Sequence, residues 1–195
     1  MQIVERKPRS IIIDGIVDRE VQSRNFKGEE KKDKVTGRTV NSPGRRNFLL
    51  ILNEEIAEEL KDRGCEVKYK KVTNPNDVPE PFISVTVSYY LRPVDAYIIS
   101  KGVTTPLDEA HVGKIDAVDI KNMAIELEFG KEKIHQAGAS AGLSYVPIFA
   151  NQIWVEVVPS YFMEKYGYMN GGADPGMASP PPVDAFEGEE SPFTV

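Results

Sequence analysis

Hydrophobic and polar residues alternate with the two-residue period of β-strands along much of this chain. The clearest segment is Phe82–Tyr90. One set of its residues is expected in the core: Ile83, Val85, Val87 and Tyr89. The other set is expected on a surface: Phe82, Ser84, Thr86, Ser88 and Tyr90. Successive side chains of a strand point to opposite faces, so this pattern predicts a strand with one buried face.

The same reasoning predicts strands elsewhere. They are expected at Ser10–Val17, Val21–Phe26, Asn47–Leu52, Cys65–Lys71, Asp95–Lys101, within Ala117–Phe129 and at Asn151–Val158. Gly15 suggests a bulge in the first of these strands. Glu126 and Glu128 alternate with apolar residues, which favours a solvated strand face for both carboxylates. In the last strand, Trp154 falls on the polar side.

One helix is expected at Glu54–Arg63, because Ile56, Ala57 and Leu60 fall on one face and Asn53 is a good N-cap. Gly64 is placed to end that helix. The remaining connections are rich in Gly, Pro or charge. They are a loop or loose hairpin at Lys27–Arg46, a connecting loop at Val72–Pro81, a mobile loop at Gly130–Leu143 and a short helix from Pro159 to Tyr166.

Six or seven strands with one or two short helices predict a mainly β fold, a small barrel. The body is expected over residues 1–166. Residues 167–195 combine Gly-Gly, Pro-Pro-Pro and acidic residues with few aliphatics, and they cannot bury enough apolar surface to offset the cost of ordering. We therefore expect a disordered acidic C-terminal tail.

Charge is distributed unevenly along the 195 residues, whose net charge is −6. Residues 1–46 hold twelve Lys and Arg against seven Asp and Glu, whereas residues 166–195 hold none against five. This asymmetry predicts a basic arm and an acidic tail. No apolar run approaches the roughly 20 residues that span a bilayer, and no signal peptide is evident. A cytoplasmic protein is expected, in the host cytoplasm if the source is viral.

Catalytic and metal-binding motifs are lacking. Cys65 is the single cysteine, which leaves no intramolecular disulfide or thiolate cluster. Neither His111 nor His135 has partners at the spacing of a metal or nucleophile motif, and no phosphate-binding glycine loop or hydrolase elbow occurs. We expect a protein that is not an enzyme and has no metal or cofactor.

The chain does contain what binding of single-stranded nucleic acid requires, a basic track for the backbone and exposed aromatic rings for the bases. Tyr90 and Trp154 are the expected stacking residues. The expected basic residues are Lys31, Lys32, Lys34, Arg38, Arg45, Arg46, Lys68, Lys70, Arg92 and Lys101. An alternative exists for both sets of residues. The two aromatic side chains would cover a hydrophobic edge or a homodimer contact, and the basic side chains would only make the surface soluble.

Four phrases carry a resemblance to a known family: NFKGEE (Asn25–Glu30), RNFLLILNEEIAEELKDRGCEVKY (Arg46–Tyr69), PFISVTVSYY (Pro81–Tyr90) and VDIKNMAIELEF (Val118–Phe129). In their order and spacing, from about Asn25 to Val158, the chain resembles the OB-fold single-stranded DNA-binding proteins of tailed phages. The resemblance implies an OB-fold-like barrel whose exposed strands and loops take up oligonucleotides.

The tail resembles those of bacterial and phage single-stranded DNA-binding proteins, where acidic residues end in hydrophobics that dock on replication or repair proteins. The residues that match this plan are Asp184, Phe186, Glu187, Glu189, Glu190, Pro192 and Phe193. Thr194 and Val195 follow them, whereas the bacterial mode uses a terminal Phe carboxylate. An acidic tail can also compete with DNA for basic residues.

These observations predict a protein that coats single-stranded DNA exposed during phage replication or recombination, with little sequence specificity. Its tail would recruit replication or repair partners. The alternatives are a phage structural or interaction protein, a strand-annealing recombination protein, and a metal-dependent nuclease.

Overall fold

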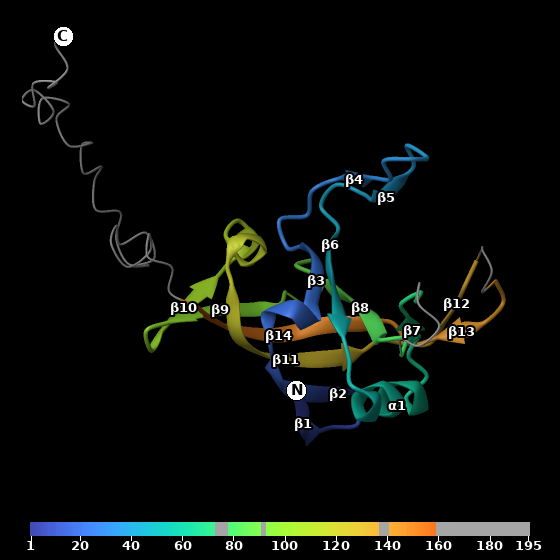
Figure 1. Ribbon diagram of the computed structural model, residues 1–195, viewed down its shortest axis with the longest axis horizontal. Coiled ribbons are helices and arrows are strands. Elements are labelled where there is room, and N and C mark those ends of the chain that lie inside the picture. Colours follow the sequence, from blue (N-terminus) through green and yellow to red (C-terminus); the bar gives the residue numbers. More distant parts are fainter. Residues whose placement is uncertain (73–77, 91–92, 137–140, 159–195) are drawn as a thin grey trace, which may run out of the picture.

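The computed structural model describes residues 1–72, 78–90, 93–136 and 141–158. A ten-stranded sheet forms most of this body (Figure 1). Its main path follows the order β1, β2, β11, β14, β8, β6, β3. The bounds are β1 Gln2–Arg6, β2 Ser10–Ile16, β11 Ile120–Phe129, β14 Ile148–Val157, β8 Pro81–Val87, β6 Arg46–Ile51 and β3 Val21–Asn25. The fold is thus mainly β and OB-fold-like, as the sequence predicted. Over the described residues, the path from β1 to β3 is not closed.

Three further strands join this sheet at its sides. They are β7 Lys68–Tyr69, which pairs with β8, and the hairpin of β9 Asp95–Ser100 and β10 Val103–Leu107, which is attached through β9 to β14. Two small hairpins stand apart from it, β4 Lys31–Lys32 with β5 Thr39–Asn41, and β12 Lys133–Ile134 with β13 Ser144–Tyr145. Figure 1 shows both projecting from the body.

Strand β14 has two parallel neighbours in succession, and this arrangement shapes the surface. Phe149 and Ala150 lie opposite Thr86 and Val87 of β8. From Gln152 onward the neighbour is β9, beginning at Asp95. Residues 88–90, which follow β8, therefore lie beside the middle of β14.

The buried residues follow the alternation that the sequence shows. Ile83, Val85 and Val87 of β8 and Ile153, Val155 and Val157 of β14 are all buried. Phe26 and Phe48 stack in the core with ring centroids 5.1 Å apart. At Gly15, φ is +78°, and the register of β2 against β11 shifts there, which confirms the bulge.

Helix α1 (Glu54–Asp62) forms as predicted. The Asn53 side chain accepts a hydrogen bond from the Ile56 amide at 3.0 Å, and Gly64 ends the helix with φ of +78°. Ile56, Ala57 and Leu60 are fully buried. No helix within the described residues is long and apolar enough to cross a membrane.

Several elements differ from expectation. The strand expected at Cys65–Lys71 shrinks to β7, because Cys65 turns inward to bridge Val146 and the Tyr69 ring lies against Lys61 of α1. The loop expected at Gly130–Leu143 contains β12. Strands β1 and β10 and the 3-10 turns at Asp18–Glu20 and Val112–Ala117 were not expected. The expected helix to Tyr166 and the tail over 167–195 lie outside the described residues.

Candidate nucleic-acid interface

The gap between β8 and β9 carries the expected stacking residue Tyr90. Ser88, Tyr89 and Tyr90 follow β8, and the Val94 amide returns to donate to the Ser88 carbonyl at 3.1 Å. Tyr90 is 89% exposed. Ser88 and Tyr90 each line two hollows.

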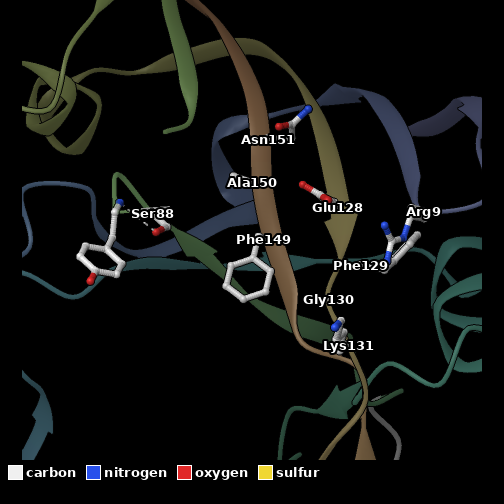
Figure 2. A pocket seen from close by; sticks show the side chains of 10 residues that line it. Arg9, Ser88, Glu128, Phe129, Gly130, Lys131, Phe149, Ala150 and Asn151 are labelled. Carbon is white, nitrogen blue, oxygen red and sulfur yellow. Dashed lines mark hydrogen bonds between the residues drawn. The ribbon is translucent and has the colours of Figure 1, made fainter. Parts of the chain in front are cut away.

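The first hollow, which we call the aromatic hollow, has a volume of about 290 Å³. Figure 2 shows Phe149 projecting from β14, with Ser88 on one side and Glu128 and Lys131 on the other. The full lining is Arg9, Ser88, Tyr90, Glu128, Phe129, Gly130, Lys131, Phe149, Ala150 and Asn151. It combines aromatic rings, two exposed cations and side chains that accept hydrogen bonds, among them Glu128 and Asn151.

The second hollow, which we call the arginine hollow, has a volume of about 360 Å³. Its lining is Gly44, Arg45, Arg46, Thr86, Val87, Ser88, Tyr89, Tyr90 and Glu109. It therefore unites three residues expected at the interface, Arg45, Arg46 and Tyr90. Arg45 is exposed, and its side chain has no ion-pair partner in the part of the chain that the structure describes.

Arg46 is held in place within the arginine hollow. Its side chain is only 15% exposed, and its guanidinium lies 2.9 Å from the Glu109 carboxylate and 5.5 Å from the centre of the Tyr89 ring. Burial raises the pKa of Tyr89 to about 12, and the nearby Arg46 charge opposes this only in part. The Tyr89 hydroxyl and Arg46 Nε are both buried without a hydrogen-bond partner among the described residues.

The β4–β5 hairpin is a basic arm that extends from this region. Two buried amides fix its base: Asn25 donates to the Glu29 carbonyl at 2.9 Å, and Asn41 donates to the Glu29 and Arg45 carbonyls at 3.0 and 2.8 Å. A buried amide with several backbone partners holds the orientation of a loop. The arm thus has a defined direction.

The arm carries the other expected cations of the N-terminal region: Lys31, Lys32, Lys34 and Arg38. All are exposed. Lys31 donates to the Arg24 carbonyl and Lys32 lies 3.6 Å from Glu30. Lys34 and Arg38 flank the tip, where Val35 is 94% exposed. Their cationic groups have no ion-pair partner within the described ranges.

Lys68 and Lys70 lie far from these groups. Lys68 is opposite Phe82 at the start of β8, whereas Arg46 is opposite Val87 at its end. Five residues of strand separate them, or about 17 Å. Lys68 pairs with Glu66 at 3.3 Å and Lys70 with Glu80 at 2.6 Å.

Of the remaining expected residues, Lys101 lies at the exposed turn between β9 and β10 with φ of +50°. Arg92 lies outside the described residues. Trp154 is half-buried on the outer side of β14, where it stacks on Tyr97 with ring centroids 6.3 Å apart and planes 13° from parallel. Tyr97 was not anticipated, because its strand lacks a clear alternation.

The expectation of a solvated strand face is wrong for Glu126. Its side chain is buried, and both carboxylate oxygens accept hydrogen bonds. Ser10 donates to Oε1 at 2.9 Å and Asn151 to Oε2 at 2.8 Å, while Lys7 Nζ lies 3.3 Å from Oε1. Burial alone would raise the pKa of Glu126, but these donors outweigh it and hold the pKa below its usual value. The carboxylate is therefore ionised at neutral pH.

Sequence reasoning missed four residues of the aromatic hollow: Arg9, Lys131, Phe149 and Asn151. A signal existed for Phe149. The alternation of β14 extends back to Ile148, and Phe149 stands between the buried Ile148 and Ala150. Asn151 is an extra residue at a bulge, where Glu126 lies opposite Gln152 and Leu127 opposite Ala150. Nothing local in the sequence marks it.

The histidines occupy surface positions. His111 is exposed and lies 2.6 Å from Asp108, whose pKa is lowered by that hydrogen bond. His135 stacks on Tyr145, with ring centroids 4.2 Å apart. Across the described ranges, no group of three or more His, Cys, Asp or Glu residues is arranged to hold a metal ion.

Comparison with known proteins gives two similarities. A family model described as "Putative phage ssDNA-binding domain" matches residues 1–135, more than half of the chain. Among solved structures, the chain is similar to a single-stranded DNA-binding protein from bacteriophage Enc34 in complex with ssDNA. The identity is 8% and the TM-score 0.45, over 79% of this chain and 89% of that one. Among curated proteins, no match was found.

Proposed function

The chain belongs to the phage single-stranded DNA-binding domain family, and on this premise we propose that its β body coats single-stranded DNA exposed during phage replication or recombination. Bases stack on exposed rings and phosphates lie against exposed cations, so binding has little dependence on sequence. The role is a non-catalytic one.

The observation that carries this proposal is Tyr90. An aromatic side chain of this size that is 89% exposed contributes nothing to the core. It lines two hollows that both contain cations, with Phe149 in one and Arg46 in the other. An exposed ring that lines two basic hollows can stack with a base while the neighbouring phosphates reach the cations of either hollow.

The proposed path runs from the basic arm through the arginine hollow, over Tyr90 and into the aromatic hollow. Lys34, Arg38 and Arg45 supply cations at one end, and Arg9 and Lys131 at the other. Trp154 and Tyr97 extend the aromatic surface along β14. Lys31, Lys32 and Lys101 remain proposed contacts at its margins, and Arg92, which lies outside the described residues, remains a proposed contact. Lys68 and Lys70 lie at the far end of β8, so they would contact the DNA only if it wraps around the body.

The acidic tail is proposed to recruit replication or repair proteins through its terminal region, around Phe186 and Phe193. We also propose that residues 167–195 compete with DNA for the basic path, because both are polyanions. Deleting 167–195 should then tighten DNA binding at low salt and change it little at high salt. Equal affinity of the two forms at low salt would contradict the competition.

The defining experiment is a titration of labelled oligo-dT and an equal-length duplex by fluorescence anisotropy at several salt concentrations. We expect tighter binding to oligo-dT, with a logarithmic salt slope of about −0.7 for each phosphate bound. Equal affinity for the two would refute single-strand selectivity. No binding to either would favour a structural or interaction role, in which the strands form an interface between proteins.

A further inference from the structure

The aromatic hollow contains a feature that sequence-independent stacking does not require. Asn151 lines it from the bulge in β14 (Figure 2), and a buried carboxylate sets the orientation of its amide. An ionised carboxylate only accepts hydrogen bonds. Because Asn151 Nδ2 donates to Glu126 Oε2 at 2.8 Å, the amide nitrogen must face Glu126 and the oxygen must face away from it.

Glu126 is itself held on its other oxygen. Ser10 and Lys7 both donate to Oε1, so the carboxylate cannot turn without losing those partners. A buried carboxylate costs desolvation energy, and an apolar residue would serve a plain sheet face at least as well. A role in positioning the Asn151 amide explains why a carboxylate is buried at position 126.

The result is a hollow that presents hydrogen-bond acceptors beside an aromatic ring. Asn151 Oδ1 has no hydrogen-bond partner among the described residues, and the Glu128 carboxylate lines the same hollow. Phe149 lies opposite Glu128 in the register of β11 and β14. A base stacked on Phe149 would therefore present its edge to the Asn151 amide oxygen.

We propose that the aromatic hollow is a nucleobase site that prefers bases with an exocyclic amino group, and that Asn151 is its specificity-determining residue. The inference rests on the proposed function and deepens it. The amino group of cytosine or adenine carries N–H donors, and the Asn151 amide oxygen can accept a hydrogen bond from one of them. Uracil and thymine carry a carbonyl oxygen where cytosine carries its amino group. That carbonyl would face the Asn151 oxygen with no hydrogen between them, so binding of these two bases is disfavoured.

The cations of the hollow do not supply this preference. Arg9 and Lys131 are long and exposed at its rim, where they can neutralise the phosphates of any nucleotide. Their replacement should weaken binding of all sequences alike.

The test compares homopolymers of dC and dU of equal length, because the two bases differ only around ring positions 3 and 4. The measured quantity is the ratio of the Kd for dU to the Kd for dC. We expect about a threefold to tenfold preference for dC in the full-length chain, the range that a single hydrogen bond provides. Asn151→Ala should bring the ratio close to one, while Gln152→Ala, a neighbour that does not line the hollow, should leave it unchanged.

Glu126→Gln provides the second variant, because it keeps the shape of the side chain but lets the Asn151 amide turn over. We expect the preference for dC to fall in this variant while circular dichroism shows a folded protein. A ratio near one in the unmodified chain, or a ratio that both variants leave intact, would overturn the nucleobase site. Failure to bind either homopolymer would instead refute the proposed function itself.

Discussion

Replacing Tyr90 with alanine tests the interface at its central residue. Its side chain is 89% exposed, so removal opens no cavity, and the free energy of unfolding should change by no more than about 0.5 kcal/mol. Loss of one stacked base weakens binding by about 1–3 kcal/mol. At about 1.4 kcal/mol for each tenfold change, the Kd for oligo-dT should rise about 5-fold to 140-fold.

The assay is fluorescence anisotropy of labelled oligo-dT at three or more salt concentrations, with urea unfolding of each variant in parallel. Tyr90→Ala should weaken binding by the same factor at each salt concentration, because tyrosine carries no charge and releases no counterions. Tyr90→Phe should retain most of the affinity. Tyr69→Ala is the matched control, since Tyr69 is a half-exposed tyrosine at the other end of β8. Unchanged affinity of folded Tyr90→Ala would refute the stacking role.

Three further predictions concern the arm, the core and the buried carboxylate. Replacing both Lys34 and Arg38 with alanine should make the logarithmic salt slope shallower by about 0.7 for each phosphate that the variant no longer binds, and Lys71→Ala should leave it unchanged in the same titrations. Phe48→Ala, which removes a ring stacked on a core neighbour, should lower the free energy of unfolding by about 3–5 kcal/mol in urea titrations. The pKa of Glu126 is lower in the folded chain than in the unfolded chain. Its ionisation therefore stabilises the fold fully at pH values above the unfolded pKa, and this contribution is lost as the pH falls through the lower folded pKa. Glu126→Gln should therefore flatten the acid side of a stability-against-pH curve, and an unaltered curve would argue against the assignment.

The sequence by itself determined the local features of this protein. Alternation identified β8 and β14 and placed Tyr90 outside the core, because the direction of a side chain from a strand depends only on its position in that strand. The Asn53 cap and the end of α1 at Gly64 also follow from local backbone chemistry.

Only the tertiary structure decided what each exposed position meets. Glu126 alternates like a solvated residue, yet Ser10 from β2 and Asn151 from β14 cover it, and neither is near it in the sequence. Arg9 and Phe149 share a hollow although 140 positions separate them. Lys68 and Arg46 both lie next to β8 but at opposite ends. The period of a pattern tells which face a side chain takes, whereas strand order, register and bulges decide its neighbours, and those depend on how distant segments of the chain pair.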